Sequence, residues 1–260
     1  MTSSFVESDE KTLVREALRK AGLALGRQEL TYLGMPEAAA LDIRILQRLL
    51  RNVICIDWER KKLEVAEHNI SDLPLKVREF HACDVWEYLK SDYYRAGLTA
   101  DMTFLDFLGG GISSADTFAH EMHALRSYFS RQALHPRTAF VFAWTYMPHD
   151  RGLQAYTRAV ENSATEEEKK MLRGLTGIRF RSLAIRLVLS RLLQEHNMTG
   201  KIYFHALYKT VMSSLILVFS KGHDPKCTLP MGSPESILSE PIRAYKKGQV
   251  VPDSINITGT

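Results

Sequence analysis

The chain has 260 residues, of which 45% are hydrophobic and 25% charged, so it can bury a substantial core and is not expected to be disordered. A formal net charge of +4 leaves an anionic partner open without requiring one. The three cysteines, Cys55, Cys83 and Cys227, form no CxxC pair, which argues against a disulfide framework and indicates a reducing compartment.

The N-terminus carries acids where a signal peptide would carry positive charge, and no apolar run reaches the length of about 18 residues that a membrane helix needs. We therefore expect a soluble, cytoplasmic protein with no membrane partner. Residues 7–22 have a helical pattern that ends at Gly22. They predict a helical extension that covers residues 1–28.

Strand and helix patterns then alternate along the chain. Residues 29–35 predict the first strand, and Pro36 suits the first turn of a helix along which Leu41, Ile45 and Leu49 share one face. The alternation continues with a strand at 53–57, a helix at 60–69, a strand at 76–84, a helix at 85–94, a strand at 101–107, a helix at 116–134 and a strand at 138–146. This order predicts parallel strands joined by right-handed crossovers.

The C-terminal third departs from this alternation. Residues 165–196 have a helical pattern that Gly174 and Gly177 interrupt, and residues 201–208 and 214–220 predict an antiparallel hairpin. Prolines then interrupt every period, so residues 223–260 predict an irregular tail. The fold class is therefore α/β: a doubly wound, Rossmann-like mixed sheet, mostly parallel with a C-terminal antiparallel hairpin and helices on both faces, formed by residues 29–222.

The most informative segment is ICIDWE, in which an apolar run ends at Asp57 and is followed by Trp58 and Glu59. A carboxylate at the end of a buried strand can bind the paired hydroxyls of a ribose, as in doubly wound nucleotide-binding folds. The alternative is a surface acid that ends a strand. Glu59 takes the ribose role if the strand is longer than predicted.

Five parallel alternations followed by a terminal hairpin resemble the class I S-adenosylmethionine-dependent methyltransferases over residues 29–222. In TYLGM, Gly34 stands where that family has its glycine loop, so the resemblance implies that Leu33, Gly34 and Met35 approach the methionine part of the cofactor. Asp57 follows Gly34 by 23 residues, close to the spacing of about 20 for a ribose-binding acid. The implied cofactor is S-adenosylmethionine.

Two further motifs extend the resemblance. ACDVWEYL resembles the family's turn after the third strand, which implies that Asp84 accepts from the adenine amino group and that Val85 packs on the ring. FLDFLGGG lies where the family has its motif at the catalytic face, which implies that Asp106 and Phe107 are catalytic and that Asp106 also contacts the cofactor. In the first loop, Glu37 occupies a position where a further glycine is expected, and its side chain could obstruct the cofactor or contact its amino group.

The methyl acceptor is expected near Asp106. An exocyclic amine needs an acceptor atom and an aromatic surface, which Asp106 and Phe107 could supply, and Tyr146 and His149 follow the fifth strand at the same edge. We expect RNA or DNA ahead of a small molecule or a protein as the acceptor. In the alternative reading, residues 109–111 form only a turn and His149 is a solvated loop residue.

Other patterns receive simpler interpretations. HEMH lacks the histidine spacing of a zinc helix, so no metal is expected. The arginines at 179, 181, 186 and 191 could bind phosphates, but we favour the interpretation that they lie on the solvent-exposed face of an amphipathic helix. Trp58 and Trp86 could cover the adenine or belong to the core. Two alternative functions stay open: a catalytically silent module that serves as a binding or partner subunit, and a dinucleotide oxidoreductase, which the missing GxGxxG disfavours.

Overall fold

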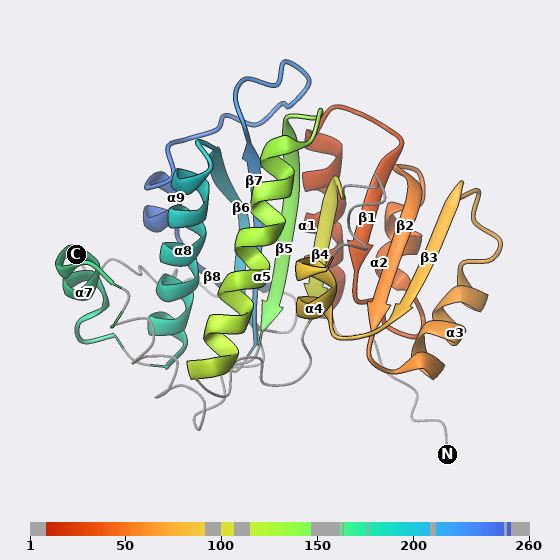
Figure 1. Cartoon of the computed structure of the whole chain (residues 1–260), viewed down its shortest axis with the longest axis horizontal. Coiled ribbons are helices and arrows are strands. Elements are labelled where there is room, and N and C mark those ends of the chain that lie inside the picture. The colour runs from red at the N-terminus through yellow and green to blue at the C-terminus, as the bar shows by residue number, and fades with distance from the viewer. Residues whose placement is uncertain are drawn as a thin grey trace.

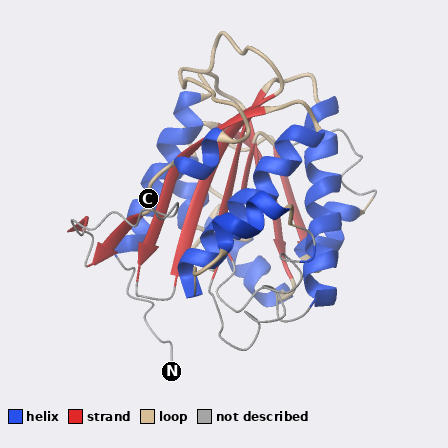
Figure 2. Cartoon of the chain, turned by 90° about the vertical axis from the view of Figure 1, so that its left-hand side faces the viewer, coloured by secondary structure: helices blue, strands red, loops and turns tan. Residues whose placement is uncertain are grey.

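The parallel strands of the chain lie in one mixed sheet with helices on both faces, as the computed structural model shows in two perpendicular views (Figure 1, Figure 2). The structure describes residues 9–91, 100–106, 115–146, 162, 164–175, 177–208, 212–246 and 249–250. The strands are β1 Leu30–Gly34, β2 Leu50–Asp57, β3 Val77–Ala82, β4 Met102–Asp106, β5 Ala139–Tyr146, β6 Thr199–Tyr208, β7 Met212–Ser220, β8 Arg243–Lys246 and β9 Gln249–Val250.

The sheet has nine strands among the described residues, in the order β3-β2-β1-β4-β5-β7-β6-β8-β9. Strands β1 to β5 pair in parallel, whereas β7 runs antiparallel to both β5 and β6. The predicted fold class, including the terminal antiparallel hairpin, is confirmed. All eight residues of β5 are buried, as expected for a central strand that is apolar throughout and covered on both faces.

The helices form two layers. They are α1 Asp9–Ala24, α2 Leu41–Leu46, α3 Arg60–Asn69, α4 Val85–Lys90, α5 Ala115–Leu134, α7 Glu166–Leu172, α8 Gly177–Glu195 and α9 Ser236–Ser239. Apolar residues of α1, α2 and α3 form one core with one face of the sheet, and those of α4, α5 and α8 form a second core with the other face. Figure 1 shows α5 and α8 in front of the sheet and α1 behind it.

The segment after β1 differs from its prediction. We expected a helical pattern from Met35 to Asn52, but α2 covers only Leu41–Leu46 and β2 already begins at Leu50. Ala40 precedes α2 in the left-handed region, with φ of 48°, which ends any helix from Pro36. Leu50 pairs with Leu30 of β1, so parallel pairing outweighs the helical period at this point.

The described parts of both terminal segments are packed on the sheet. Helix α1 buries Val14, Leu18 and Ala21, so the N-terminal extension contributes to the core. The tail was expected to be irregular, and for its described part this is wrong, because β8 pairs in parallel with β6 and Gly232 bridges Gly200 in β6. These contacts cover part of an edge that would otherwise expose unpaired backbone groups. The domain boundaries at residues 28 and 222 stay predictions.

The strand order creates a topological switch point between β1 and β4. From β1 the chain continues to β2 on one side, and β4 pairs on the other side. In open α/β sheets, ligands bind outside the carboxyl ends of the strands at such a point, because the loops on the two sides diverge. Helix α1 runs against the strand direction, since Lys11 lies near Asp106 at the end of β4 whereas Gly22 lies near Met102 at its start.

Candidate functional site

Gly34 ends β1 at the switch point, and its immediate neighbour is Tyr32. A Cβ atom at position 34 would lie 2.3 Å from the Tyr32 hydroxyl oxygen, so a larger residue would force the buried tyrosine to move. The Tyr32 hydroxyl donates to the buried carboxylate of Asp42, and the backbone N–H of Met35 donates to the Phe104 carbonyl oxygen at 3.2 Å. A glycine at position 34 therefore leaves space for the Tyr32 side chain. The resemblance gave a different reason for this glycine, namely the approach of the cofactor.

Four charged side chains meet beside this strand end. Arg15 Nη2 donates to Glu37 Oε2 at 2.9 Å, and Lys11 Nζ forms an ion pair with Glu37 Oε1. Lys11 Nζ also lies 3.9 Å from Asp106 Oδ2. The α1 cations thus connect the loop after β1 with the end of β4. We call Lys11, Arg15 and Glu37 the α1 clasp.

Asp106 is the most unusual group of the site. Its side chain is only 10% exposed, and its Oδ1 atom is buried with no hydrogen-bond partner among the described residues. Burial raises the pKa of this carboxyl, and the charge of Lys11 opposes the rise. A small cavity here is lined by Lys11, Val14, Arg15, Phe104, Asp106 and Thr145. A buried acceptor atom without a donor costs stability, so Asp106 is a candidate for a role in binding or catalysis.

We expect Asp106→Asn to raise the free energy of unfolding at pH 7. The pKa of Asp106 is raised in the folded state, so folding opposes its ionisation, and stability falls as pH rises from the unfolded value of about 3.9 through the folded one. The variant should therefore gain stability at pH 7 and lose that gain in acid. Urea titrations at pH 3 and pH 7 measure the difference.

Asp72→Asn provides the control for this measurement. Asp72 is a surface carboxylate, 65% exposed and paired with Arg44, so its substitution should change stability by less than about 0.5 kcal/mol at either pH. A loss of stability in Asp106→Asn at pH 7 would contradict the assignment of Asp106 as a buried acid whose pKa folding raises.

Asp57 ends β2 as the sequence predicts, and its side chain is buried. Its Oδ1 atom accepts from the backbone N–H of Glu59 at 2.8 Å, and its Oδ2 atom lies 3.2 Å from Lys62 Nζ. The neighbouring Trp58 is 74% exposed. An exposed indole beside a fixed carboxylate offers a stacking surface next to a hydrogen-bond acceptor. Glu59 is more exposed than Asp57 and precedes α3.

Asp84 and Val85 lie at the start of α4. Asp84 Oδ1 accepts from the backbone N–H groups of Trp86 and Glu87, at 2.8 and 3.0 Å, so this carboxylate caps the helix. Val85 is buried in the core, as are Leu33 and, in part, Met35. Their proposed contacts with a cofactor stay predictions.

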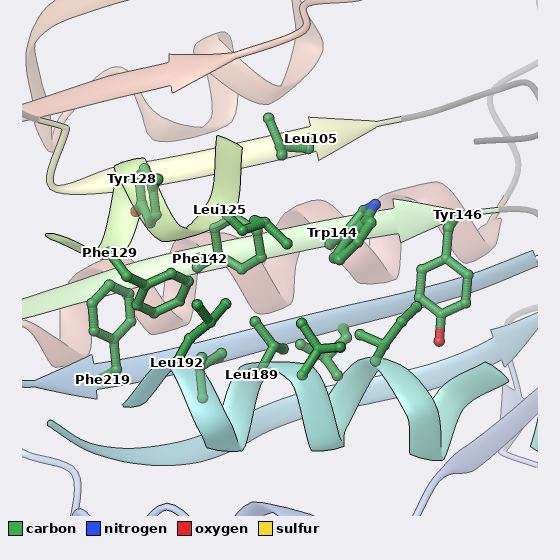
Figure 3. Close-up of a cluster of buried hydrophobic side chains, with 14 of the residues drawn as sticks. Leu105, Leu125, Tyr128, Phe129, Phe142, Trp144, Tyr146, Leu189, Leu192 and Phe219 are labelled. Atoms are coloured by element: carbon green, nitrogen blue, oxygen red, sulfur yellow. The ribbon is translucent and has the colours of Figure 1, made fainter. Parts of the chain in front are cut away.

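Tyr146 ends β5 but is almost fully buried. Figure 3 shows it at the end of the strand with its hydroxyl pointing toward α8. The hydroxyl oxygen lies 3.2 Å from Ser182 Oγ and 3.4 Å from His205 Nε2. Tyr146 therefore faces an internal polar network, and its predicted place beside an open acceptor pocket is not what the described residues show. Phe107 and His149 lie outside the described residues.

Arg186 is the centre of that internal network. It is fully buried; its Nε donates to His205 Nδ1 at 3.0 Å, and its Nη1 donates to the carbonyl oxygens of Ile237, at 3.2 Å, and Glu240. Burial lowers the pKa of Arg186 to about 10, and burial beside this cation holds the pKa of His205 well below its usual range. The prediction that this arginine lies on the solvent-exposed face of its helix is wrong for Arg186, because its side chain faces the tail and donates to the carbonyl oxygens there.

Metal and membrane features are not found in the described part of the chain. No three His, Cys, Asp or Glu side chains there are grouped so that they could hold a metal ion. None of the helices within the described ranges is long and apolar enough to cross a membrane.

Known proteins were compared with both the sequence and the structure. No family model and no curated protein matches the sequence. Among solved structures, an rRNA methylase from Streptococcus thermophilus covers 84% of this chain and 100% of its own, with 14% identity and a TM-score of 0.46. An O-methyltransferase from Bacillus cereus in complex with SAH covers 84% of both chains, with 12% identity and a TM-score of 0.45. The magnesium protoporphyrin IX methyltransferase from Synechocystis, with bound SAH, covers 85% of this chain and 90% of its own, with 14% identity and a TM-score of 0.47.

The sheet order itself decides the architecture. Five parallel strands in the order β3-β2-β1-β4-β5, continued by the antiparallel β7 and then β6, are the arrangement that the sequence resemblance implies. The chain has the class I methyltransferase fold. In this methyltransferase fold, the structure brings Gly34 and Asp106 together at the switch point and places Asp57 and Trp58 on the neighbouring strand.

Sequence reasoning missed Lys11, Arg15, Tyr32 and Asp42 as members of the site. Lys11 and Arg15 are four residues apart and therefore share one face of α1, which was a readable signal. Their partners Glu37 and Asp106 are 26 and 95 residues away from Lys11, so no local pattern connects them.

Proposed function

We propose that this chain is an S-adenosylmethionine-dependent methyltransferase that binds its cofactor along the carboxyl ends of β1 to β4. The observation that carries the proposal is the buried Asp106 Oδ1 atom, which has no partner among the described residues and lies at the β1/β4 switch point. Methyl transfer requires an aligned acceptor and, for a weak nucleophile, a proton acceptor at such a position.

The residues at the edge of the sheet fit an adenosine group. Asp57 would hold the ribose hydroxyls, and the exposed Trp58 would cover the adenine. When bound, the cofactor supplies an electrophilic methyl group on a sulfonium. The protein need supply mainly alignment and exclusion of water, which the enclosed position of Gly34 and Asp106 favours.

Asp106 would orient the acceptor and accept its proton at Oδ1 or Oδ2. Burial raises the pKa of its carboxyl, which makes the carboxylate a stronger base than a solvated one. The acceptor class that we propose is an exocyclic amine of RNA or DNA. Its support is the modest positive charge of the chain together with the acidic group at the end of β4.

The catalytically silent module is the second candidate, and one observation favours it. Both oxygens of Asp57 already have partners, the Glu59 N–H and Lys62, and Glu37 already neutralises two cations at the switch point. In this alternative, the ion pairs replace the cofactor permanently, and the chain acts as a binding or partner subunit.

Binding of S-adenosylhomocysteine separates the two candidates. Of the three tryptophans, Trp86 and Trp144 are buried, so quenching of fluorescence by added iodide should report on Trp58. We expect micromolar binding in calorimetry and protection of Trp58 from iodide, with the iodide-sensitive signal absent in Trp58→Phe. No binding by folded, ligand-free protein would favour the silent module instead.

A further inference from the structure

The α1 clasp is a partly buried ion cluster in which one carboxylate satisfies two cations. The side chain of Arg15 is 6% exposed, that of Lys11 18% and that of Glu37 26%. Arg15 Nη2 and Lys11 Nζ contact different oxygens of Glu37, so its carboxylate is held from two sides. Of the three groups, Glu37 has the greatest access to water.

The clasp borders the small cavity beside Asp106. Lys11 and Arg15 line the same small cavity as Asp106, whose buried Oδ1 atom has no partner among the described residues. Glu37 belongs to the loop after β1, which is the loop that faces a ligand at a switch point. The Glu37 carboxylate thus pairs with Lys11 and Arg15 beside the cavity in which Asp106 Oδ1 has no partner among the described residues.

We propose that Lys11 and Arg15 form the subsite for the carboxylate of the amino-acid end of the ligand, and that Glu37 is an internal substitute which this carboxylate displaces. The inference rests on the proposed function, because the ligand is S-adenosylmethionine or its product. It adds a selective step: a nucleoside without an amino-acid end cannot replace Glu37 and therefore gains nothing from the two cations.

The exchange is electrostatically balanced. One carboxylate leaves the two cations and another takes its place, so neither Lys11 nor Arg15 loses a counterion at the end of the exchange. Asp106 lies 3.9 Å from Lys11, and its negative charge disfavours the approach of a further anion. While Glu37 is bound, the ligand-competent form is only a fraction of the population, so the apparent affinity is lowered by that fraction.

Two ligands and two substitutions test the exchange. S-adenosylhomocysteine carries the amino-acid end, and methylthioadenosine lacks it. Lys11→Met should weaken S-adenosylhomocysteine by about 10- to 100-fold, the loss of one charge-assisted contact, and leave methylthioadenosine unchanged. Glu37→Gln should strengthen S-adenosylhomocysteine by about tenfold, because the competing carboxylate is gone, and again leave methylthioadenosine unchanged.

The control is Lys20→Met on the same helix, where the lysine is 57% exposed and pairs with Glu16. It should alter neither affinity. Calorimetry gives both dissociation constants, and thermal unfolding checks that each variant is folded. If Lys11→Met does not fold, Glu37→Gln alone decides the question by the direction of its effect.

Opposite effects of the two substitutions support the exchange, because a merely structural ion cluster would give losses in both. Binding of S-adenosylhomocysteine that weakens or does not change in Glu37→Gln overturns this inference and leaves the methyltransferase proposal intact. Failure of the unmodified protein to bind S-adenosylhomocysteine overturns both.

Discussion

Asp57→Ala is expected to weaken binding of S-adenosylhomocysteine by about 100-fold, whereas Asp106→Ala should leave binding within a few-fold. The two carboxylates lie on different strands of one edge, and only Asp57 adjoins the exposed Trp58 that would cover the adenine. Asp106 should instead affect methyl transfer, by about 100-fold or more, because we propose that it orients the acceptor. Calorimetry measures binding, and transfer of labelled methyl groups to total RNA or denatured DNA measures turnover.

The structural role of Asp57 calls for its own control. Asp57 also accepts from the Glu59 N–H and pairs with Lys62, so its removal loosens the turn into α3. Lys62→Met removes the ion pair but keeps the carboxylate of Asp57. The affinity for S-adenosylhomocysteine should be retained, because Asp57 Oδ2 is then available to accept from the ribose hydroxyls. Equal loss of binding in Asp57→Ala and Asp106→Ala would refute the division of roles.

The order of the sheet could be predicted from the sequence because its signals are local. Helix α3 has the predicted bounds, Arg60–Asn69, and the predicted C-terminal ends of β1, β2 and β5 differ from the observed ones by no more than one residue. Long apolar runs and short polar turns specify such elements without knowledge of their partners. Leu50 shows the limit: its place in β2 depends on pairing with Leu30, which is a non-local contact.

The site was only partly predictable, for two physical reasons. Asp84 opens the sequence DVWE, in which an acid three residues before a glutamate is a local signal for a helix N-cap, and the capping contacts are present. The same carboxylate of Asp84 was assigned to the adenine amino group from the resemblance, so the local sequence supports two different roles for it. The α1 clasp and Tyr146, by contrast, depend on contacts between segments far apart in the chain, and no single-segment pattern encodes them.

Arg186→Met is expected to lower the free energy of unfolding by about 3 kcal/mol or more, since each buried polar group left without a partner costs about 1–3 kcal/mol. The guanidinium has no acceptor atoms and only donates, so His205 accepts at Nδ1 and carries its proton on Nε2, from which it can donate to Ser213 Oγ at 3.0 Å. Methionine fills the volume but leaves His205 Nδ1 and the carbonyl oxygens of Ile237 and Glu240 without donors.

Arg179→Met on the same helix provides the comparison for Arg186→Met. Arg179 is exposed, so its substitution should change the free energy of unfolding by less than about 0.5 kcal/mol in the same urea titration. Arg186→Lys should fall between them, because a lysine keeps the charge but cannot reach the histidine and both carbonyls at once.

Since Ile237 and Glu240 belong to the tail, proteolysis after Gly222 should accelerate in Arg186→Met and not in Arg179→Met. Stability equal to that of the unmodified protein would mean that the tail is held to the sheet by its strand pairing and apolar contacts, and that the buried cation contributes nothing to it.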